Sequence, residues 1–358
     1  MTEAQTGTKP VAESHAFDVA ALQAYLEPRL EGFEGPLTVE QFKGGQSNPT
    51  YQLNTPQRSY VMRSKPGPAA KLLASAHAID REFTVMRALH ATDVPVPEMY
   101  LLCEDETVIG RAFYVMEYMA GRVMWDQSIP DADNARRARI YDEMNRVIAA
   151  LHNVDGKAAG LAAYGKPGNY FERQIGRWTK QYQASITQPI DAMDRLIEWL
   201  PAHIPASARD ESQVSVVHGD YRLDNLVFHP SEPRVVAVLD WELSTLGDPL
   251  ADFAYHAMMF RMPPDIVAGL AGADLAALNI PDEASYRDAY CRHAGRPPMS
   301  DADYNFYIAF NFFRLAAIFH GMKGRVIRGT ASNAHTRERV TKLPKLIALA
   351  VESMEACL

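Results

Sequence analysis

Cysteine is scarce in this chain of 358 residues. Its three cysteines, Cys103, Cys291 and Cys357, lie far apart in the sequence, and no CxxC pair occurs. This spacing argues against a disulfide framework and against a metal site built from thiolates. The sequence therefore fits a reducing, cytoplasmic environment.

Long apolar runs and blocks of basic residues are also missing. The most apolar late segment, 306–319, is interrupted by Asn311 and Arg314 and is shorter than the roughly 20 residues that a membrane helix needs, so we expect a buried core helix. Residues 1–18 lack the basic start and apolar run of a signal peptide and are expected to form a frayed tail. A net charge of -8 without a Lys/Arg block indicates neither a nucleic-acid nor a membrane partner.

The remaining composition is that of an ordinary globular protein. Apolar residues make up 47% and charged residues 22% of a chain long enough for two substantial lobes. No internal repeat or low-complexity tract is visible. The oligomeric state is left open.

The first 121 residues alternate strand-like and helical patterns. A hairpin with a polar tip is predicted over 37–55, because alternating residues flank a run rich in Gly, Ser and Asn. The other expected elements are a helix near 17–28, a strand at 59–65, a helix over 75–92, and strands within 94–105 and 107–121.

The rest of the chain is mainly helical by pattern. Helices are expected near 131–153, 170–186, 189–200, 250–260, 282–294, 301–328 and 334–355, and a strand-rich stretch lies at 214–239. We therefore predict a small mixed α/β lobe at 1–117 and a larger, mostly helical lobe at 118–358. A cleft between two lobes is a usual place for a ligand.

Polar side chains concentrate in VVHGDYRLDNLVFHP, residues 216–230, between two apolar runs that read as strands. Asp220 and Asn225 are five positions apart, and VVAVLDWE ends a further apolar strand at Asp240. Carboxylate and amide oxygens suit a hard cation such as Mg²⁺, which usually takes only one or two carboxylates from the protein. Asn225 and Asp240 could supply that share, which leaves Asp220 to accept a proton as a general base.

HGDYRLDN (218–225) followed by DWE (240–242) resembles the catalytic signature of the aminoglycoside phosphotransferase and choline-kinase-like family. The layout is similar to the catalytic loop and metal-binding Asp of protein kinases. The resemblance implies an α+β, bilobal protein-kinase-like fold, with an antiparallel sheet and one main helix in the small lobe. It also implies an ATP-dependent, Mg²⁺-dependent small-molecule kinase in which Asp220 is the catalytic base and Asn225 and Asp240 bind the metal.

The same resemblance implies a nucleotide site in the small lobe. FKGGQSNPTYQL looks like the loop that covers the nucleotide, with phosphate contacts from Gly45, Gln46, Ser47 and Asn48. Arg63 in YVMR stands where kinases carry a phosphate-binding Lys, and Lys65 on the same strand face is the competing choice. Glu82 resembles the acidic partner of that residue. Glu117 and Met119 in FYVMEYMAG look like the hinge whose backbone contacts adenine.

Four further stretches narrow the resemblance: SAHAIDREFTVMRAL, VPVPEMYLLCED, FYVMEYMAGR and LDWELSTLGDPLADFAY. Together they look like the kinase-like domain that is fused to acyl-CoA dehydrogenases in some eukaryotic proteins. That subgroup implies a CoA-linked acceptor, a hydroxyacyl thioester or a related hydroxy acid, and not an aminoglycoside.

Alternatives stay open at several positions. His218 is expected to brace the loop, Asp248 to cap the helix that begins at Pro249, and the aromatic residues of 306–313 to be core. Arg222 and Asp224 are unassigned, and Glu242 is a second metal contact or a backbone partner. For Arg314 and Arg325, an ion pair or a solvated face is favoured over contact with an anionic substrate.

Two rival functions come from other classes. One is a catalytically silent nucleotide-binding module with the same fold. The other is a metal-dependent hydrolase with four ligands, namely His218, Asp220, His229 and Asp240.

Overall fold

The computed structural model describes residues 7–44, 48–67, 78–166, 168–186, 188–327, 338 and 340–357. The chain divides into two compact units. The first unit consists of Met1–Trp125, Lys157–Tyr164 and Leu223–Ser244. The second unit consists of Asp126–Gly156, Gly165–Arg222 and Thr245–Leu358.

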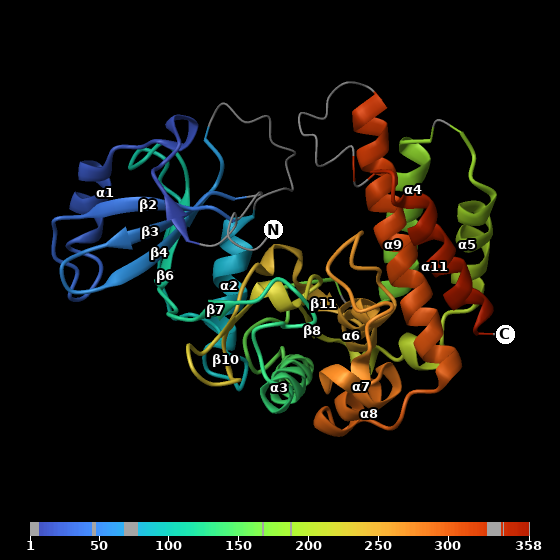
Figure 1. The fold of residues 1–358 in the computed structure, drawn as a ribbon. Coiled ribbons are helices and arrows are strands. Elements are labelled where there is room, and N and C mark those ends of the chain that lie inside the picture. Colours follow the sequence, from blue (N-terminus) through green and yellow to red (C-terminus); the bar gives the residue numbers. More distant parts are fainter. Residues whose placement is uncertain are drawn as a thin grey trace. The chain divides into compact units, whose positions relative to one another are not determined.

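An antiparallel sheet forms the body of the first unit (Figure 1). Its strands run in the order β1-β2-β3-β4-β6-β5. Their bounds are β1 Thr8–Lys9, β2 Thr38–Phe42, β3 Thr50–Asn54, β4 Ser59–Ser64, β5 Met99–Cys103 and β6 Phe113–Glu117. The predicted hairpin is confirmed, since Thr38 pairs with Asn54 and Gln41 with Tyr51.

The expectation of a frayed tail is wrong for the described part of the N-terminus. β1 pairs with β2, Thr8 opposite Phe42, and the short 3-10 helix Glu13–His15 follows. The backbone N–H of Ala12 donates to the side chain of Gln41, and the hydroxyl of Tyr51 donates to the carbonyl of His15. The pairing with β1 uses backbone groups of β2 that an edge strand would otherwise leave unpaired.

Two helices belong to the sheet unit. α1 (Val19–Leu26) begins after Asp18, whose side chain accepts from the N–H of Ala21, and it buries Leu22 and Leu26 in the core shared with the sheet. α2 (Ile79–Leu89) buries one face on β5 and β6. Both helices were expected at these places.

A second small sheet completes the first unit. β9 (Leu226–Phe228) lies between β7 (Arg122–Val123) and β10 (Val235–Val238), and all pairings are antiparallel. The N–H of Val238 donates to the carbonyl of Pro95 at 2.8 Å. The segment that carries Asn225 and Asp240 is therefore joined to the sheet unit.

The second unit is mostly helical (Figure 1). A two-stranded ribbon, β8 (Ser215–Val217) with β11 (Thr245–Gly247), stands among the helices. The helices are α3 Asn134–His152, α4 Tyr170–Ala184, α5 Asp191–Ala202, α6 Pro249–Ala257, α7 Leu275–Leu278, α8 Glu283–His293, α9 Asp301–Ile327 and α11 Leu343–Glu355.

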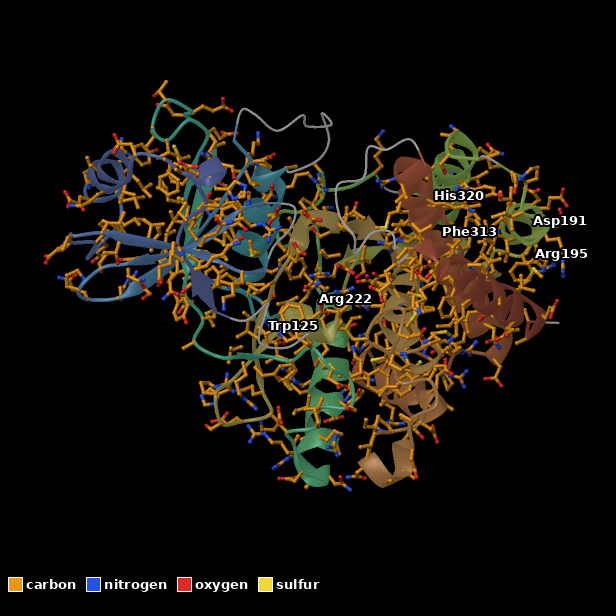
Figure 2. All side chains as sticks on the ribbon, turned by 45° about the horizontal axis from the view of Figure 1, so that its top comes forward. Trp125, Asp191, Arg195, Arg222, Phe313 and His320 are labelled. Carbon is orange, nitrogen blue, oxygen red and sulfur yellow. The ribbon has the colours of Figure 1, made fainter. Side chains whose placement is uncertain are left out.

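The long helix α9 forms the core of this unit and packs against α4, α6 and α11. The expected aromatic cluster is confirmed as core, because its members are at most 2% exposed: Phe306, Tyr307, Phe310, Phe312 and Phe313. Figure 2 shows Phe313 and His320 along α9, and Asp191 and Arg195 on α5. A helix that is apolar on nearly all sides is stable only when other helices cover it.

The α+β class is confirmed by these two units. The short α7 and the strand β11 were not predicted, since four and three residues are too short to show a period. The lobe limits 1–117 and 118–358 stay a prediction. Over the described ranges, we find no helix with the length and apolar character needed to cross a bilayer.

Candidate functional site

Arg63, on β4, is the centre of a charged cluster in the first unit. Its Nε lies 3.1 Å from Glu82 Oε2, and its Nη2 lies 2.8 Å from Asp240 Oδ1 and 3.6 Å from Glu242 Oε2. Burial alone would lower the pKa of Arg63, but the carboxylates, Glu82 first, outweigh it and raise the pKa. The guanidinium group therefore keeps its charge.

Glu82 lies in the first turn of α2 and is 1% exposed. Besides Arg63, it accepts hydrogen bonds from Asn48 Nδ2 at 3.1 Å and from the hydroxyl of Tyr114 at 3.0 Å. Burial raises the pKa of Glu82 to about 7, although Arg63 acts in the opposite direction. The side chain of Asn48, predicted to contact phosphates, is thus directed at Glu82.

Arg63 and Lys65, the two candidates for the basic residue of this site, differ in their positions and contacts. Arg63 lies within β4, whereas Lys65 comes after the strand has ended at Ser64. The basic side chain that contacts Glu82 and Asp240 is that of Arg63. Lys65 is half-buried, and its backbone N–H donates to the carbonyl of Ala112.

Asp240 and Asn225 are neighbours through the backbone. The N–H of Leu239 donates to the carbonyl of Asn225 at 2.9 Å, which places the residue before Asp240 against Asn225. Asp240 has a left-handed backbone, φ 67 and ψ 56, which is uncommon for a residue other than glycine and tends to occur at functional sites. Its carboxylate is 34% exposed.

The charge of this cluster suits a divalent cation. Three carboxylates, those of Glu82, Asp240 and Glu242, share the single guanidinium group of Arg63. When all are ionised, three negative charges and one positive charge leave a net charge of -2. Asn225 and Asp240 offer the amide and carboxylate oxygens that Mg²⁺ prefers, so the residues present fit this ion.

The other residues predicted to bind the nucleotide are described by the structure only in part. Gly45, Gln46 and Ser47 lie outside the described residues. Glu117 is the last residue of β6, and Met119 follows it as a half-buried residue outside regular structure. The N–H of Glu117 donates to the carbonyl of Glu98, so a contact with adenine would fall to the Glu117 carbonyl oxygen.

The loop that carries Asp220 belongs to the second unit, and its backbone is held by Asp252 of α6. Asp252 is 3% exposed and accepts from the N–H groups of His218 at 2.7 Å and Gly219 at 2.8 Å. Gly219 has φ +81, a conformation that glycine adopts without steric cost. The loop therefore turns sharply at Gly219 and presents Asp220 next.

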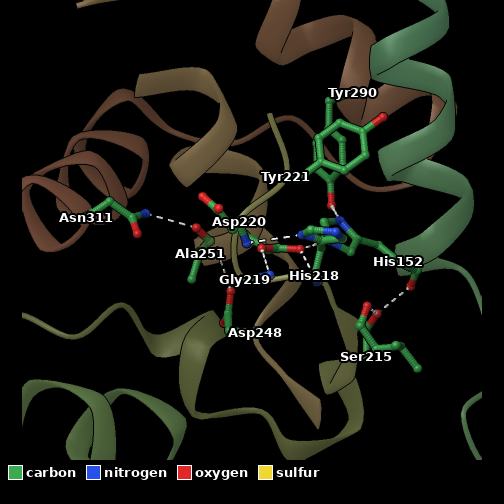
Figure 3. A network of polar contacts seen from close by, with 12 residues as sticks. His152, Ser215, His218, Gly219, Asp220, Tyr221, Asp248, Ala251, Tyr290 and Asn311 are labelled. Atoms are coloured by element: carbon green, nitrogen blue, oxygen red, sulfur yellow. Dashed lines mark hydrogen bonds and ion pairs between the residues drawn. The ribbon is translucent and has the colours of Figure 1, made fainter. Parts of the chain in front are cut away.

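Asp252 is itself held by a buried chain of polar groups, part of which Figure 3 shows. His152 Nε2 lies 3.2 Å from Asp252 Oδ2, and His152 Nδ1 lies 2.7 Å from the hydroxyl of Tyr290. Burial lowers the pKa of His152, which fits a neutral ring that donates to Asp252. Burial would raise the pKa of Asp252, but the bonds from His152 and His218 lower it.

The carboxylate of Asp220 lies near Tyr255 and Arg222. The hydroxyl of Tyr255 donates to Asp220 Oδ1 at 2.6 Å, and Arg222 Nε lies 3.7 Å from the same oxygen. His218 is fully buried, and its Nδ1 accepts from the N–H of Asp220, as a bracing residue does. Asp220 belongs to the second unit, so its convergence with Asn225 and Asp240 stays a prediction.

Other expectations can be placed as well. Asp248 caps α6, since its side chain accepts from the N–H of Ala251 and Pro249 is the first helical residue. Arg314 donates to the carbonyl of Gly219 at 2.7 Å, a hydrogen bond where an ion pair or a solvated face was favoured. The side chain of Arg325 lies outside the described residues.

Asp252 and Tyr255 were missed by the sequence analysis. Both lie in GDPLADFAY, in which the sequence analysis predicted a helix cap at Asp248. Asp252 comes four positions after Asp248, and an acidic residue inside an otherwise apolar helix start is the signal that could have revealed it.

The hydrolase alternative finds no support in the ligand geometry. Within the part of the chain that the structure describes, no three His, Cys, Asp or Glu side chains are grouped to hold a metal ion. His218 and His229 both use Nδ1 to accept local backbone hydrogen bonds. A site made of one amide and one carboxylate, as predicted for Mg²⁺, does not require such a group.

The chain is similar in sequence to known proteins. A sequence model described as "Phosphotransferase enzyme family" matches residues 38–302. The chain is 46% identical over 344 residues to acyl-CoA dehydrogenase family member 10 of Mus musculus, covering 95% of this chain and 31% of that protein. It is 40% identical over 340 residues to acyl-CoA dehydrogenase family member 11 of Homo sapiens, covering 93% and 43%. The chain thus spans less than half the length of these curated relatives.

The chain is also similar to proteins whose structures have been solved. A protein of Ralstonia eutropha JMP134, named as a candidate aminoglycoside phosphotransferase, is 57% identical with a TM-score of 0.87, covering 95% of this chain and 99% of that one. Choline kinase of Cryptosporidium parvum Iowa II is 11% identical with a TM-score of 0.66, covering 94% and 97%, and so shares the fold. The resemblance predicted from the motifs is confirmed, including that to the domain carried by acyl-CoA dehydrogenase relatives.

Proposed function

Because this chain belongs to the phosphotransferase enzyme family, we propose that it is a cytoplasmic kinase that moves the γ-phosphoryl group of ATP to a hydroxyl group of a small molecule. The observation that carries the proposal is the cluster around Arg63. A buried guanidinium group, held by Glu82 and Asp240, supplies the positive charge that phosphate oxygens need. Positioning and electrostatics are what phosphoryl transfer requires of a protein.

In this proposal the nucleotide is bound by the first unit. Arg63 donates to the phosphates, and Glu82 keeps Arg63 in place. The backbone of Glu117 and Met119 contacts the adenine. Asn225 and Asp240 would hold Mg²⁺, which neutralises charge on the phosphates.

Asp220 acts on the acceptor. It accepts the hydroxyl proton of the acceptor as that oxygen forms its bond to the γ-phosphorus. The bond between the γ-phosphorus and the bridging oxygen breaks, and ADP leaves with that electron pair. His218 and Asp252 hold the loop backbone so that Asp220 keeps its place.

We further propose a hydroxyacyl-CoA or a related hydroxy acid as the acceptor. Support comes from the relatives named as acyl-CoA dehydrogenases, of which this chain covers 31% in the mouse protein and 43% in the human protein. A phosphotransferase domain joined to an acyl-CoA dehydrogenase would have a use for an acceptor of the same chemical class.

The test is a screen for nucleotide consumption with Mg²⁺ and either ATP or GTP. The acceptors are 3-hydroxybutyryl-CoA, 4-hydroxyvaleryl-CoA, their free acids, choline, glucose and kanamycin, and mass spectrometry identifies the phosphorylated product. We expect Asp220→Asn to lose at least about 99% of the activity, since general-base catalysis contributes roughly 10²–10⁴-fold. Asp282→Asn is the matched control, because this exposed helix cap is equally well served by asparagine.

Ligand binding provides a second measurement. Titration calorimetry should show that Mg²⁺ strengthens ATP binding to the unaltered protein and fails to do so in Asp240→Asn. Near-normal turnover in Asp220→Asn contradicts the base. Stabilisation by nucleotide without consumption of any acceptor favours the silent module, and stabilisation by Zn²⁺ alone favours the hydrolase.

A further inference from the structure

The hydroxyl of Tyr255 is directed at the side chain that the proposed function uses as its base. Tyr255 lies on α6, and its hydroxyl donates to Asp220 Oδ1 at 2.6 Å. This distance is typical of a hydrogen bond from a hydroxyl to a carboxylate. Burial, and then the negative charge of Asp220, raise the pKa of Tyr255, so the phenol keeps the proton that it donates.

We propose that Tyr255 is a positioning residue, which orients the carboxylate of Asp220 toward the hydroxyl group of the acceptor. The inference rests on the proposed function, since it gives Asp220 a task. A hydrogen bond to Oδ1 restricts rotation of the carboxylate and thereby sets the direction of Oδ2. Correct placement of a reacting group is worth a large part of an enzyme's rate enhancement.

Arg314, on α9, connects Tyr255 to the same loop. Its Nη2 donates to the carbonyl of Gly219 at 2.7 Å, and its guanidinium carbon lies 4.7 Å from the centre of the Tyr255 ring. The same carbon lies 5.6 Å from the centre of the Trp178 ring, on α4. A cation above an aromatic face is attracted by the ring. Arg314 therefore holds the tyrosine ring and the residue before Asp220 in one arrangement.

Four other polar groups contact Asp220 or the backbone next to it in other ways. Arg222 Nε is 3.7 Å from Oδ1, beyond hydrogen-bond distance. His218 accepts from the backbone N–H of Asp220, Asp252 accepts from that of Gly219, and Arg314 contacts the Gly219 carbonyl. These three contacts fix the backbone, whereas Tyr255 contacts the carboxylate itself.

The test removes one hydroxyl group and records the signal of the Asp220 carboxylate at a single pH of 8. Aspartate side chains are labelled with ¹³C at the carboxyl carbon, and the signal that disappears in Asp220→Asn identifies Asp220. In Tyr255→Phe we expect the chemical shift of this signal to change, because the carboxylate loses the hydrogen bond that it accepts at Oδ1. Tyr141→Phe is the matched control, since its buried hydroxyl donates to the Gln127 carbonyl, also at 2.6 Å.

The outcomes separate this inference from the proposed function. An unchanged chemical shift of the Asp220 carboxyl signal in Tyr255→Phe, or an equal change in Tyr141→Phe, overturns the positioning role, and neither result depends on nucleotide or acceptor. With an acceptor from the screen, kcat of Tyr255→Phe should fall about tenfold at an unchanged KM for MgATP, and an unchanged kcat also overturns the role. Full activity in Asp220→Asn would instead overturn the proposed function.

Discussion

Replacement of Asp252 by asparagine should lower the free energy of unfolding by about 1.5–5 kcal/mol. Asp252 Oδ2 accepts from the N–H of His218 and from His152 Nε2, and Oδ1 accepts from the N–H of Gly219. Asparagine has nearly the same shape but only one acceptor oxygen. If that oxygen replaces Oδ2, the N–H of Gly219 faces the NH₂ group of the asparagine. If it replaces Oδ1, the N–H of His218 and His152 Nε2 face the NH₂ group instead.

The magnitude follows from two contributions. Hydrogen bonds to a charged group are worth about 1.5–3 kcal/mol against about 1 kcal/mol for neutral ones, so loss of the charge costs about 0.5–2 kcal/mol for the backbone bond that asparagine still accepts. A buried N–H without an acceptor costs about 1–3 kcal/mol more. Asp252 is 3% exposed, so water cannot replace the lost partner.

Urea unfolding, followed by far-UV circular dichroism and by tryptophan fluorescence, measures the change. Coincident transitions are required before a single free energy is derived. Asp265→Asn is the control, because this 49% exposed carboxylate pairs with Lys342 and Lys345 at the surface, where such pairs contribute about 0–1 kcal/mol. A loss below about 1 kcal/mol for Asp252→Asn would refute the reasoning.

Two more predictions concern buried titratable groups. At pH 8, Glu82→Ala should lower the free energy of unfolding by about 3–5 kcal/mol, because it removes the carboxylate that accepts from Asn48, Arg63 and Tyr114. Urea unfolding measures the change, and Glu352→Ala, on the outer face of α11, is the control. Equal free energies of unfolding for the two variants would contradict the prediction. Burial lowers the pKa of His256 to about 4, so below pH 6.5 the unfolded chain binds a proton that the folded protein does not, and stability falls as pH falls from 6.5 toward 4. Between pH 7 and pH 5 the unaltered protein should therefore lose about 2 kcal/mol more than His256→Gln, and identical losses would contradict a neutral, buried His256.

Long elements could be predicted because their apolar residues recur with a clear period. The apolar residues of α3 and α4 repeat every three to four residues over at least three turns, α9 was expected from its apolar run at 306–319, and the structure has all three helices where they were expected. β1 could not be predicted, since Thr8 and Lys9 form a strand only because β2 offers them a free edge. Such pairing is decided by contacts between distant segments and leaves no local pattern.

The candidate site likewise contains residues that the sequence could predict and residues that it could not. Arg63, Glu82 and Asp240 could be proposed from motifs, and the structure brings their side chains into contact. The motif predicted a phosphate contact for Asn48, but it could not predict that the buried side chain of Asn48 donates to Glu82. Tyr255 has no motif at all, since its relation to Asp220 arises from the way α6 packs beside the loop.

The interleaving of the two units limits how the chain can be cut into working pieces. Residues 223–244 are grouped with 1–125, although about a hundred residues of chain separate them. A truncated gene that ended at Trp125 would encode Arg63 and Glu82 without Asp240, and β7 without its partner β9. Such a fragment would leave a guanidinium group short of countercharge and a strand edge open to aggregation. Experiments that exchange the first unit between members of this family should therefore transfer residues 1–125, 157–164 and 223–244 together.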